Sequence, residues 1–579
     1  MNTQKVILFS TAFLLLTLFV AWYVGQEHYI YSWDYETYHR FYRDLGTHLR
    51  QSPVRAISSV VNSVRNSDYN MLPTLFLMPF YFSFGSGRLA YILSIGVLFA
   101  FPTIVLFTWL MKELQARRAN EKEADALIPF FIAIAIIGFS PQFWAPVLLG
   151  YVDVVGLAVI FIVLTLYFRK DLEDHSVRSM IALGLLLSLI VLLRRWYAYW
   201  VAGFLFAMFV TAWVGIRHNT HPIAQLRRRF QNLVVVGTTA FFSFFTLATP
   251  LAERILTTDY RDIHSAYRGS DSLLFHLSRL SHQYGLLFLT TSVLGLIRRV
   301  AIDEEKPVAL FLAVQFVATF LLFTRTQLID IHHYYWVSSI LFIFAAFFWQ
   351  ELYGWLKGRV LKAAVVSSLI AVCLLNSLIV FHRNWNNLFG PADEIFPQLR
   401  RYPLERKDLD QVHQLLLTLN DLTRNSDNTI YVLASSIVLN GSIVRSGCSS
   451  FESALATLEQ KILITHDVDK RDGFPFHFFN AQYVIVTNPV SYSLAPQDQR
   501  VVGVLAEQLL NGEQVGQAYE KLPFEFALED DSRAYIYKKT KNFDAAALKH
   551  LSDTFVELYP SYRKKFELTP ETIRALSSS

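Results

Sequence analysis

Long apolar stretches alternate with short polar ones from the N-terminus to residue 381. Lipid offers no water to backbone groups, so a spanning segment is a helix of roughly 20 mostly apolar residues. About eleven segments meet this rule. They are 5–26, 88–111, 126–145, 148–168, 178–195, 197–216, 230–250, 281–297, 307–324, 334–354 and 361–381. The first lacks a small-residue cleavage site, so we interpret it as an uncleaved anchor.

Lys and Arg gather in every second loop between these segments, as they do in cytoplasmic loops. They are Lys112, Arg117, Arg118, Lys122, Arg169, Lys170, Arg217, Arg227, Arg228, Arg229, Arg298, Arg299, Lys306, Lys357, Arg359 and Lys362. This alternation predicts a multi-pass protein of the cytoplasmic (inner) membrane with a cytoplasmic N-terminus. Residues 27–87, 251–280 and 382–579 then lie on the extracytoplasmic side.

The first outer loop, residues 27–87, is too polar to span a membrane. Its second half, LPTLFLMPFYFSFG, is apolar and aromatic but contains Pro73 and Pro79. We interpret it as a short helix at the membrane surface rather than a twelfth span. No internal repeat is evident in the sequence, which weighs against a transporter built from inverted repeats.

The pattern changes after residue 382. LDQVHQLLLTLNDL within 405–425 has apolar residues at helical spacing, whereas TIYVLAS at 429–435 and AQYVIVT at 481–487 indicate buried strands. A helix near 498–510 and the strand AYIYKK at 534–539 follow. We therefore expect a polytopic α-helical transmembrane domain over 1–382 and an extracytoplasmic α/β domain over 383–579. The second domain covers the membrane site, binds a partner or only stabilises the protein.

The composition supports a membrane protein. Hydrophobic residues make up 53% of the chain and charged residues 17%, against about 25% charged residues in an average soluble domain. These values exclude a disordered chain, a coiled coil and a disulfide scaffold. The 2 cysteines are far apart and form no zinc-finger spacing. The net charge of +5 is modest for 579 residues, so the positions of the charges are more informative than their sum.

Acidic residues lie at the predicted outer ends of spans, where ionisable side chains are functional candidates. Asp34 and Glu36 follow the first span within WDYETY. Aromatic walls lower the local dielectric and raise a carboxylate pKa, which suits a general base. The other interpretation is an interfacial aromatic belt with solvated charges. Asp153 lies at the outer end of the fourth span, where a catalytic and a structural role both stay open.

Two arginines lie on the same side, against the usual bias of positive charge toward the cytoplasm. Arg194 and Arg195 occupy the outer turn between the fifth and sixth spans and need a partner there. One such partner is a phosphate, which matches the planar donor fork of a guanidinium. The alternatives are an ion pair with Asp34, Glu36 or Asp153, or contact with the phosphate of a membrane lipid.

Two histidines, His332 and His333, stand between the ninth and tenth spans. We expect one of them to bind a phosphate, or a metal ion together with an acid from the first outer loop. Arg268 belongs to the polar outer loop 251–280, which we interpret as a lid over the membrane site. For most residues of this loop the other interpretation is a solvated loop. Acids, arginines and histidines thus gather at the outer ends of the spans. The site is expected to open at the outer membrane–water boundary and to handle an anionic headgroup.

Several stretches of the sequence occur in a recognisable order. WDYETY follows the first span, FGSGRLAYIL ends the long outer loop, and PQFWAPVLLGYVDVVGLAVIF covers the third and fourth spans. NAQYVIVTNP, GEQVGQAY and AYIYKK belong to the C-terminal part. In this order they resemble the GT-C superfamily of integral membrane glycosyltransferases, particularly the protein mannosyltransferase and aminoarabinose-transferase-like branch.

The resemblance implies transfer of a sugar from a polyprenyl-phosphate carrier to a glycan, lipid or protein acceptor outside the cytoplasm. It places Asp34 as the base or acceptor-orienting acid, and it matches Asp153 to a second acid at the top of the fourth span. The family often has adjacent acids in the first loop, but here Tyr35 separates Asp34 from Glu36. A departing phosphate needs positive charge or hydrogen-bond donors. The candidates are Arg194, Arg195, Arg268, His332 and His333.

The main competing hypothesis is a transporter or flippase of a lipid-linked anion. A transporter of this kind is expected to have charged residues near the centres of its spans and an internal repeat. In this sequence most charges lie at the ends of the spans. A lipid-to-lipid phosphoryl or acyl transferase and a non-catalytic scaffold also stay open. The expected partners are the polyprenyl-phosphate sugar, its acceptor and membrane lipids, with no nucleic acid. No motif specifies a cofactor, and a divalent metal ion is compatible with the acids and histidines.

The predicted topology can be tested by labelling single cysteines in intact cells, with Cys373 and Cys448 replaced by Ser. We expect an impermeant thiol reagent to label a cysteine at position Arg500 in intact cells. Cysteines at positions Asn120 and Thr220 should be labelled only after the cells are opened, because the alternation of Lys and Arg places both positions on the cytoplasmic side. Labelling of Asn120→Cys and Thr220→Cys from outside would refute this orientation.

Overall fold

The structure is a computed structural model in which residues 3–116, 127–214, 222–263, 265–267, 272–302, 305–389, 394–451 and 455–578 are described. The chain forms two compact units. The first, called the apolar unit here, comprises residues 1–27, 37–260 and 270–403. The second, the C-terminal unit, comprises residues 28–36, 261–269 and 404–579.

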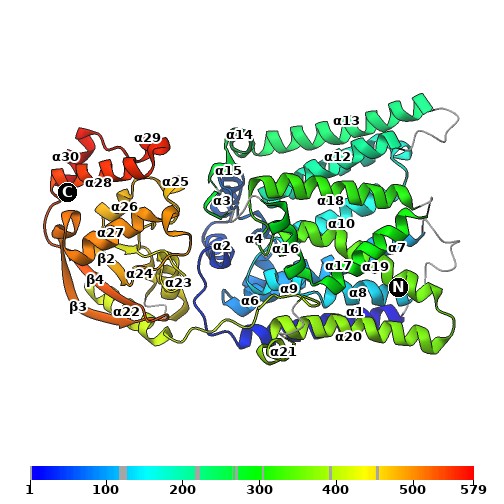
Figure 1. Cartoon of the computed structure of the whole chain (residues 1–579), viewed down its shortest axis with the longest axis horizontal. Coiled ribbons are helices and arrows are strands. Elements are labelled where there is room, and N and C mark those ends of the chain that lie inside the picture. The colour runs from blue at the N-terminus through cyan, green and yellow to red at the C-terminus, as the bar shows by residue number, and fades with distance from the viewer. Residues whose placement is uncertain are drawn as a thin grey trace. The chain divides into compact units, whose positions relative to one another are not determined.

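The apolar unit is built from the predicted membrane helices (Figure 1). Among the described residues, 7 helical segments are long and apolar enough to cross a membrane. They are α1 (Thr3–Gly25), the run α6–η1–α7 (Arg88–Ile95, Gly96–Ala100, Phe101–Ala116), α12 (Ala198–Val214) with the preceding turn η3 (Arg195–Tyr197), α13 (Pro222–Leu247), α18 (Lys306–Thr326), α19 (Tyr334–Trp355) and α20 (Arg359–Phe381). The polytopic helical fold expected from the sequence is confirmed.

The other four predicted spans are less regular than the sequence suggested. Two are pairs of bent helices, α8 (Leu127–Gly138) with α9 (Pro141–Leu148), and α16 (Leu273–Tyr284) with α17 (Leu286–Val300). Two are shorter apolar helices, α10 (Val154–Phe168) and α11 (Val177–Leu193). The described residues therefore contain up to 9 full spans when each bent pair counts as one.

Two of the predicted boundaries were wrong for a local reason. The span expected over 281–297 turns by 104° between α16 and α17. Gly285 forms this turn with a φ of 75°, and a Cβ there would lie 2.6 Å from the carbonyl oxygen of Ile395. The span expected over 148–168 becomes a helix only from Val154, after a turn in which Gly150 has a φ of 95°. Glycine adopts these left-handed conformations without strain.

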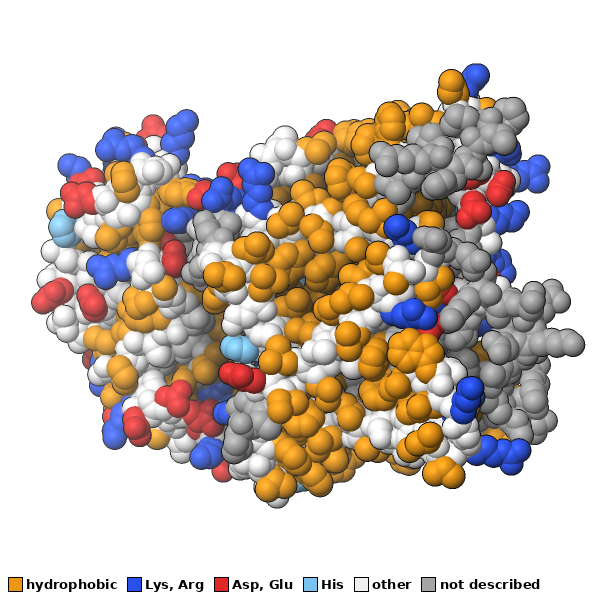
Figure 2. All heavy atoms as spheres, turned by 45° about the vertical axis from the view of Figure 1, so that its right-hand side comes forward, with side chains coloured by type: hydrophobic (Ala, Val, Ile, Leu, Met, Phe, Trp, Pro, Cys, Tyr) orange, Lys and Arg blue, Asp and Glu red, His pale blue; other side chains and the backbone are white. Residues whose placement is uncertain are grey.

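The helices of the apolar unit pack in pairs. Helix α17 lies against α19, α12 against α18, and α11 against α13. Most of α19 is buried, whereas α1 and α13 expose many large apolar side chains. Figure 2 shows hydrophobic side chains over much of the visible face of this unit. An exposed apolar surface of this extent fits contact with lipid chains.

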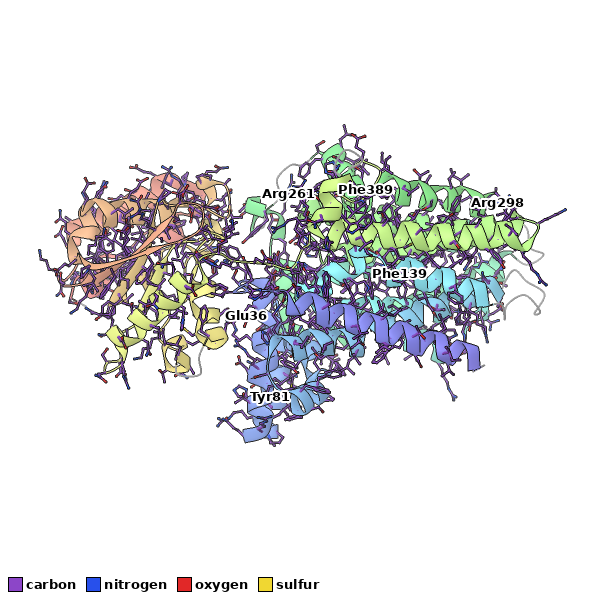
Figure 3. All side chains as sticks on the ribbon, turned by 90° about the horizontal axis from the view of Figure 1, so that it is seen from below. Glu36, Tyr81, Phe139, Arg261, Arg298 and Phe389 are labelled. Atoms are coloured by element: carbon purple, nitrogen blue, oxygen red, sulfur yellow. The ribbon has the colours of Figure 1, made fainter. Side chains whose placement is uncertain are left out.

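The loop over residues 27–87 contributes short helices and no span. They are α2 (Asp34–Gln51), α3 (Pro53–Asn66), α4 (Leu72–Leu75) and α5 (Met78–Phe84). Helix α3 starts at Pro53 behind the cap Ser52, whose hydroxyl accepts the Arg55 N–H. Tyr81 of this loop and Phe389 lie toward one end of the unit and Arg298 near the other (Figure 3). The apolar half of the loop is too short to span a membrane, as predicted.

The segment that follows the last span stays with the apolar unit as far as residue 403, whereas the sequence placed the domain boundary at 382–383. After α21 (Arg383–Phe389), backbone bonds fasten this segment to the helices. Leu286 N donates to Glu394 O (3.0 Å), Gln398 N to His282 O (2.8 Å) and Arg401 N to Val380 O (2.9 Å). These long-range bonds are not visible in the sequence pattern.

The C-terminal unit contains a four-stranded mixed sheet in the order β1-β2-β4-β3. The strands are β1 (Ile430–Leu433), β2 (Tyr483–Asn488), β3 (Tyr519–Ala527) and β4 (Arg533–Lys539). β1 and β2 are parallel, and β4 pairs antiparallel with both β2 and β3. The α/β organisation expected from the sequence is confirmed, and β3 is a strand that the sequence pattern had not indicated.

Helices cover both faces of this sheet. Alternate residues of β1 and β2 belong to two separate cores, with Leu433 and Val486 on one face and Val432 and Ile485 on the other. The first core includes residues of α27 (Arg500–Asn511) and α28 (Ala545–Leu558), and the second includes α22 (Leu409–Thr423) and α23 (Gly441–Phe451). Smaller helices complete the unit. They are α24 (Ala456–Glu459), α25 (Asp469–Asp472), α26 (Phe476–Phe479), α29 (Arg563–Phe566) and α30 (Pro570–Ser578).

The contact between α17 and α19 generates a stability prediction. A Cβ at Gly295 would overlap the backbone carbonyl of Phe344, whereas a Cβ at Gly237 on α13 meets nothing within 4 Å. We expect Gly295→Ala to lower the free energy of unfolding by about 1–3 kcal/mol, because the helices must move apart. Gly237→Ala is the matched control and should unfold no earlier than wild type. Thermal unfolding of the detergent-solubilised protein measures both, and equal midpoints would contradict the close packing.

Candidate functional site

Asp153 is the most buried of the acids that the sequence singled out. It precedes α10 and is completely shielded from solvent. Its Oδ1 accepts from Arg194 Nε (2.7 Å) and from Trp196 Nε1 (2.8 Å), and its backbone oxygen accepts from the Tyr197 hydroxyl (2.8 Å). Its Oδ2 has no hydrogen-bond partner among the described residues. The carboxylate therefore keeps one acceptor atom unused inside the protein.

Arg194 ends α11 and is buried like its partner. Its guanidinium carbon lies 5.0 Å from the ring centre of Tyr38 and 4.8 Å from that of Tyr69, and it also bonds to the Tyr38 hydroxyl. Breaking a buried ion pair by removing one partner costs about 3–5 kcal/mol. The sequence left an ion pair between Arg194 and Asp153 as one of several possibilities, and it is the one realised here.

The two histidines belong to the same cluster. The His332 ring stacks on Tyr151 at 4.3 Å, and the His333 ring lies 5.1 Å from that of Trp196. Burial, followed by the positive charge of Arg194, holds the pKa of His332 well below its usual range. His332 is therefore uncharged at pH 7. Its Nδ1 has no partner in the part of the chain that is described.

Arg195 belongs to a different cluster of side chains, which is partly exposed to solvent. Its Nη1 lies 2.6 Å from Asp68 Oδ2, and its guanidinium stacks 4.3 Å from the ring centre of Tyr260. Arg254 also pairs with Asp68, at 3.2 Å. Two guanidinium groups thus share one carboxylate, which leaves a surplus positive charge at a partly exposed position.

Asp34 begins α2 and is half-buried, and Glu36 is buried in the first turn. Trp33, just before the helix, has a φ of 49°, a conformation that a bulky residue adopts only when its surroundings enforce it. The Trp33 N–H donates to Ser442 Oγ at 2.9 Å. Burial and then the charge of Asp467 raise the pKa of Tyr267, and the charge of Asp34 adds to this effect. Asp34 and Tyr267 are therefore electrostatic neighbours within the C-terminal unit.

The structure thus brings together Asp153, Arg194, His332 and His333, whereas Asp34 and Glu36 belong to the C-terminal unit and Arg195 to the Asp68 group. Arg268 lies outside the described residues. Within the described ranges, no group of three His, Cys, Asp or Glu side chains could hold a metal ion. The sequence had not singled out Asp68 or Arg254, because an isolated acid and an isolated base in polar loops give no pattern.

No protein-family model and no curated protein sequence match this chain. Crystal structures of the aminoarabinose transferase ArnT from Cupriavidus metallidurans share its fold. The structure bound to undecaprenyl phosphate is 12% identical, covers 93% of this chain and 98% of its own, and has a TM-score of 0.50. The apo structure is 12% identical, covers 92% and 98%, and has a TM-score of 0.51. An oligosaccharyltransferase from Archaeoglobus fulgidus covers 82% and 67% at 11% identity with a TM-score of 0.43.

The similarity to ArnT extends over nearly the whole chain, including the helical membrane part and the C-terminal unit with its strands. At 12% identity it establishes the fold. The chain has the GT-C fold, as the sequence resemblance implied.

The buried pair predicts strong energetic coupling between two residues on separate helices. Asp153→Asn and Arg194→Met should each lower the free energy of unfolding by about 3–5 kcal/mol. The double variant should cost clearly less than the two together, because each change removes the same interaction. Arg195→Met is the control, with a partly exposed partner and an expected cost of at most about 1 kcal/mol. Denaturant titration in mixed micelles measures all four, and strictly additive costs would argue against the pair.

Proposed function

We propose that this protein is a glycosyltransferase that moves a sugar from a polyprenyl-phosphate carrier to an acceptor at the outer face of the cytoplasmic membrane. The observation that carries the proposal is the shared fold with ArnT over nearly the whole of both chains. That ArnT structure holds undecaprenyl phosphate. The gathering of acids, arginines and histidines at the ends of apolar helices supports it, because a lipid-linked anionic donor presents its reactive group at this level.

Asp34 is the general base in this proposal. It takes the proton of the acceptor hydroxyl or amine, whose oxygen or nitrogen then bonds to the anomeric carbon of the sugar. The bond from that carbon to the phosphate oxygen breaks, and its electron pair leaves with the phosphate. The strained turn at Trp33 supports the choice of Asp34, since strain of this kind concentrates at functional positions.

Arg195 and Arg254 are the proposed contacts of the carrier phosphate. They share Asp68 and together leave a surplus positive charge, which a phosphate compensates through charge-assisted hydrogen bonds. Arg194 is already neutralised by Asp153, so we assign it a positioning role rather than direct phosphate capture. Neutral His332 and the unpaired Asp153 Oδ2 offer hydrogen bonds to the uncharged part of the donor.

Replacing the proposed base tests the function. We expect Asp34→Asn to fold, insert and bind the carrier normally, and to lower the transfer rate by roughly 10²–10⁴-fold, because Asn keeps the size and removes the basic oxygen. Transfer from a defined polyprenyl-phosphate sugar, with variants at matched membrane levels, measures the rate.

Glu36→Gln is the matched control for this assay, since it removes a neighbouring carboxylate from the same helical turn and should do less harm. Near-normal transfer by Asp34→Asn would remove Asp34 from the mechanism. If Asp153→Asn alone were inactive while retaining its fold, the base would move to the start of α10. Carrier movement across the bilayer without sugar transfer would favour a flippase instead.

A further inference from the structure

A polar cavity lies in the apolar unit, and the residues that flank His332 and His333 in the sequence form part of its lining. Its volume is about 360 Å³, within the range of small-ligand sites. Three segments line it: α16, the turn before α19, and the chain just ahead of residue 403. The lining residues are Phe275, Ser278, Arg279, His282, Gln283, Asp330, Ile331, Tyr334, Gln398, Leu399 and Arg401.

The charge of this cavity is positive and largely uncompensated. Neither Arg279 nor Arg401 forms a salt bridge in the described part of the chain, whereas Arg194, Arg195 and Arg299 each pair with a carboxylate. Arg279 bonds with the Tyr334 hydroxyl. The one acid in the lining, Asp330, accepts the backbone N–H of Ile331 at 2.7 Å. Arg401 Nη1 donates to the Arg400 backbone oxygen at 3.3 Å. Each guanidinium group therefore has a neutral hydrogen-bond partner but no carboxylate partner within the described residues, and its positive charge attracts an anion.

Buried hydrogen-bond donors without partners complete the site. Gln283 is 6% exposed, and its Nε2 has no partner among the described residues. The Nε of Arg401 is buried and likewise unused within the described ranges. A buried donor that makes no hydrogen bond destabilises the protein. A ligand with several acceptor oxygens, such as a phosphate, would satisfy these donors together with the guanidinium groups.

The walls of the cavity are rigidly connected. Gln398 N donates to His282 O at 2.8 Å, and Gln142 Nε2 donates to the backbone oxygen of Gln283 at 2.6 Å. Arg401 N donates to Val380 O at 2.9 Å. These bonds fix the backbone segments that carry the donors before a ligand arrives, which lowers the entropic cost of binding.

The position of α16 indicates where the ligand comes from. This helix turns by 104° against the apolar α17, so it lies nearly across the direction of a span. Its Leu273, Leu274 and Leu277 are exposed, at 49%, 76% and 43%, while Arg279 and His282 line the cavity. An amphipathic helix of this kind lies in the plane of a membrane surface, with its apolar side chains toward the acyl chains.

We propose that this cavity binds a phosphate group, presented by an amphiphile at the membrane surface and held by Arg279, Arg401 and Gln283. This inference concerns a site other than the proposed carrier contacts at Arg195 and Arg254. It does not depend on sugar transfer.

The test measures binding to the full-length protein without any sugar donor. Nanodiscs of phosphatidylcholine carry a small fraction of fluorescent phosphatidic acid, whose headgroup is a phosphate monoester. We expect saturable binding that falls at least about tenfold in Arg279→Gln combined with Arg401→Gln, since each removes charge-assisted hydrogen bonds. Gln283→Leu should cause a smaller loss, because it removes one uncharged donor.

Arg325→Gln is the matched control, since it removes an exposed outer arginine that does not line the cavity. It should bind like wild type, and thermal unfolding verifies that all variants fold. Inorganic phosphate provides the second arm. If inorganic phosphate displaces the fluorescent lipid only at concentrations far above that of the lipid, the site binds a lipid-borne phosphate. If inorganic phosphate binds tightly and loses this binding in the same arginine variants, the site binds free phosphate. Unsaturable binding by wild type, or equal losses in Arg325→Gln and the double variant, would overturn the proposal.

Discussion

The buried carboxylate of Asp153 imposes the main constraint on the end of the apolar unit at which α10 begins and α11 ends. A charge without water must be paired, and Arg194 pairs it at 2.7 Å. That pairing requires the end of α11 to contact the start of α10. Arg194 also bonds to Tyr38, so α2 packs at the same position. Helices that lipid alone would leave free to slide are thereby fixed at one end.

This constraint also decides which arginines are available to ligands. Arg194 is committed to the fold, whereas Arg195 and Arg254 share Asp68, and Arg279 and Arg401 form no salt bridge in the described part of the chain. Arg194 is thus neutralised inside the protein, whereas the surplus positive charge of the described residues lies near the ends of the apolar helices. Anionic headgroups of lipids occupy the same level, which is consistent with a lipid-linked donor.

Much of the fold could be predicted from the sequence, because a span is a local property of about 20 apolar residues. Strands β1, β2 and β4 were equally visible as short apolar runs. The breaks at Gly285 and before Val154 could not be predicted, since they depend on contacts such as that with Ile395, more than a hundred residues away. For the site, the candidates Asp153, Arg194 and His332 do meet, but the sequence left the partner of Arg194 open. Arg279 and Arg401 escaped notice because long polar outer segments have no positional rule.

The central claim is that the chain handles a polyprenyl-phosphate donor, and the lipid that co-purifies with it tests this most directly. Mass spectrometry of protein extracted in mild detergent should detect a polyprenyl phosphate, with or without its sugar, in stoichiometric amount. Exchange against added polyprenyl phosphate should follow saturation. Ordinary phospholipid alone, combined with no retention of added polyprenyl phosphate, would contradict the account.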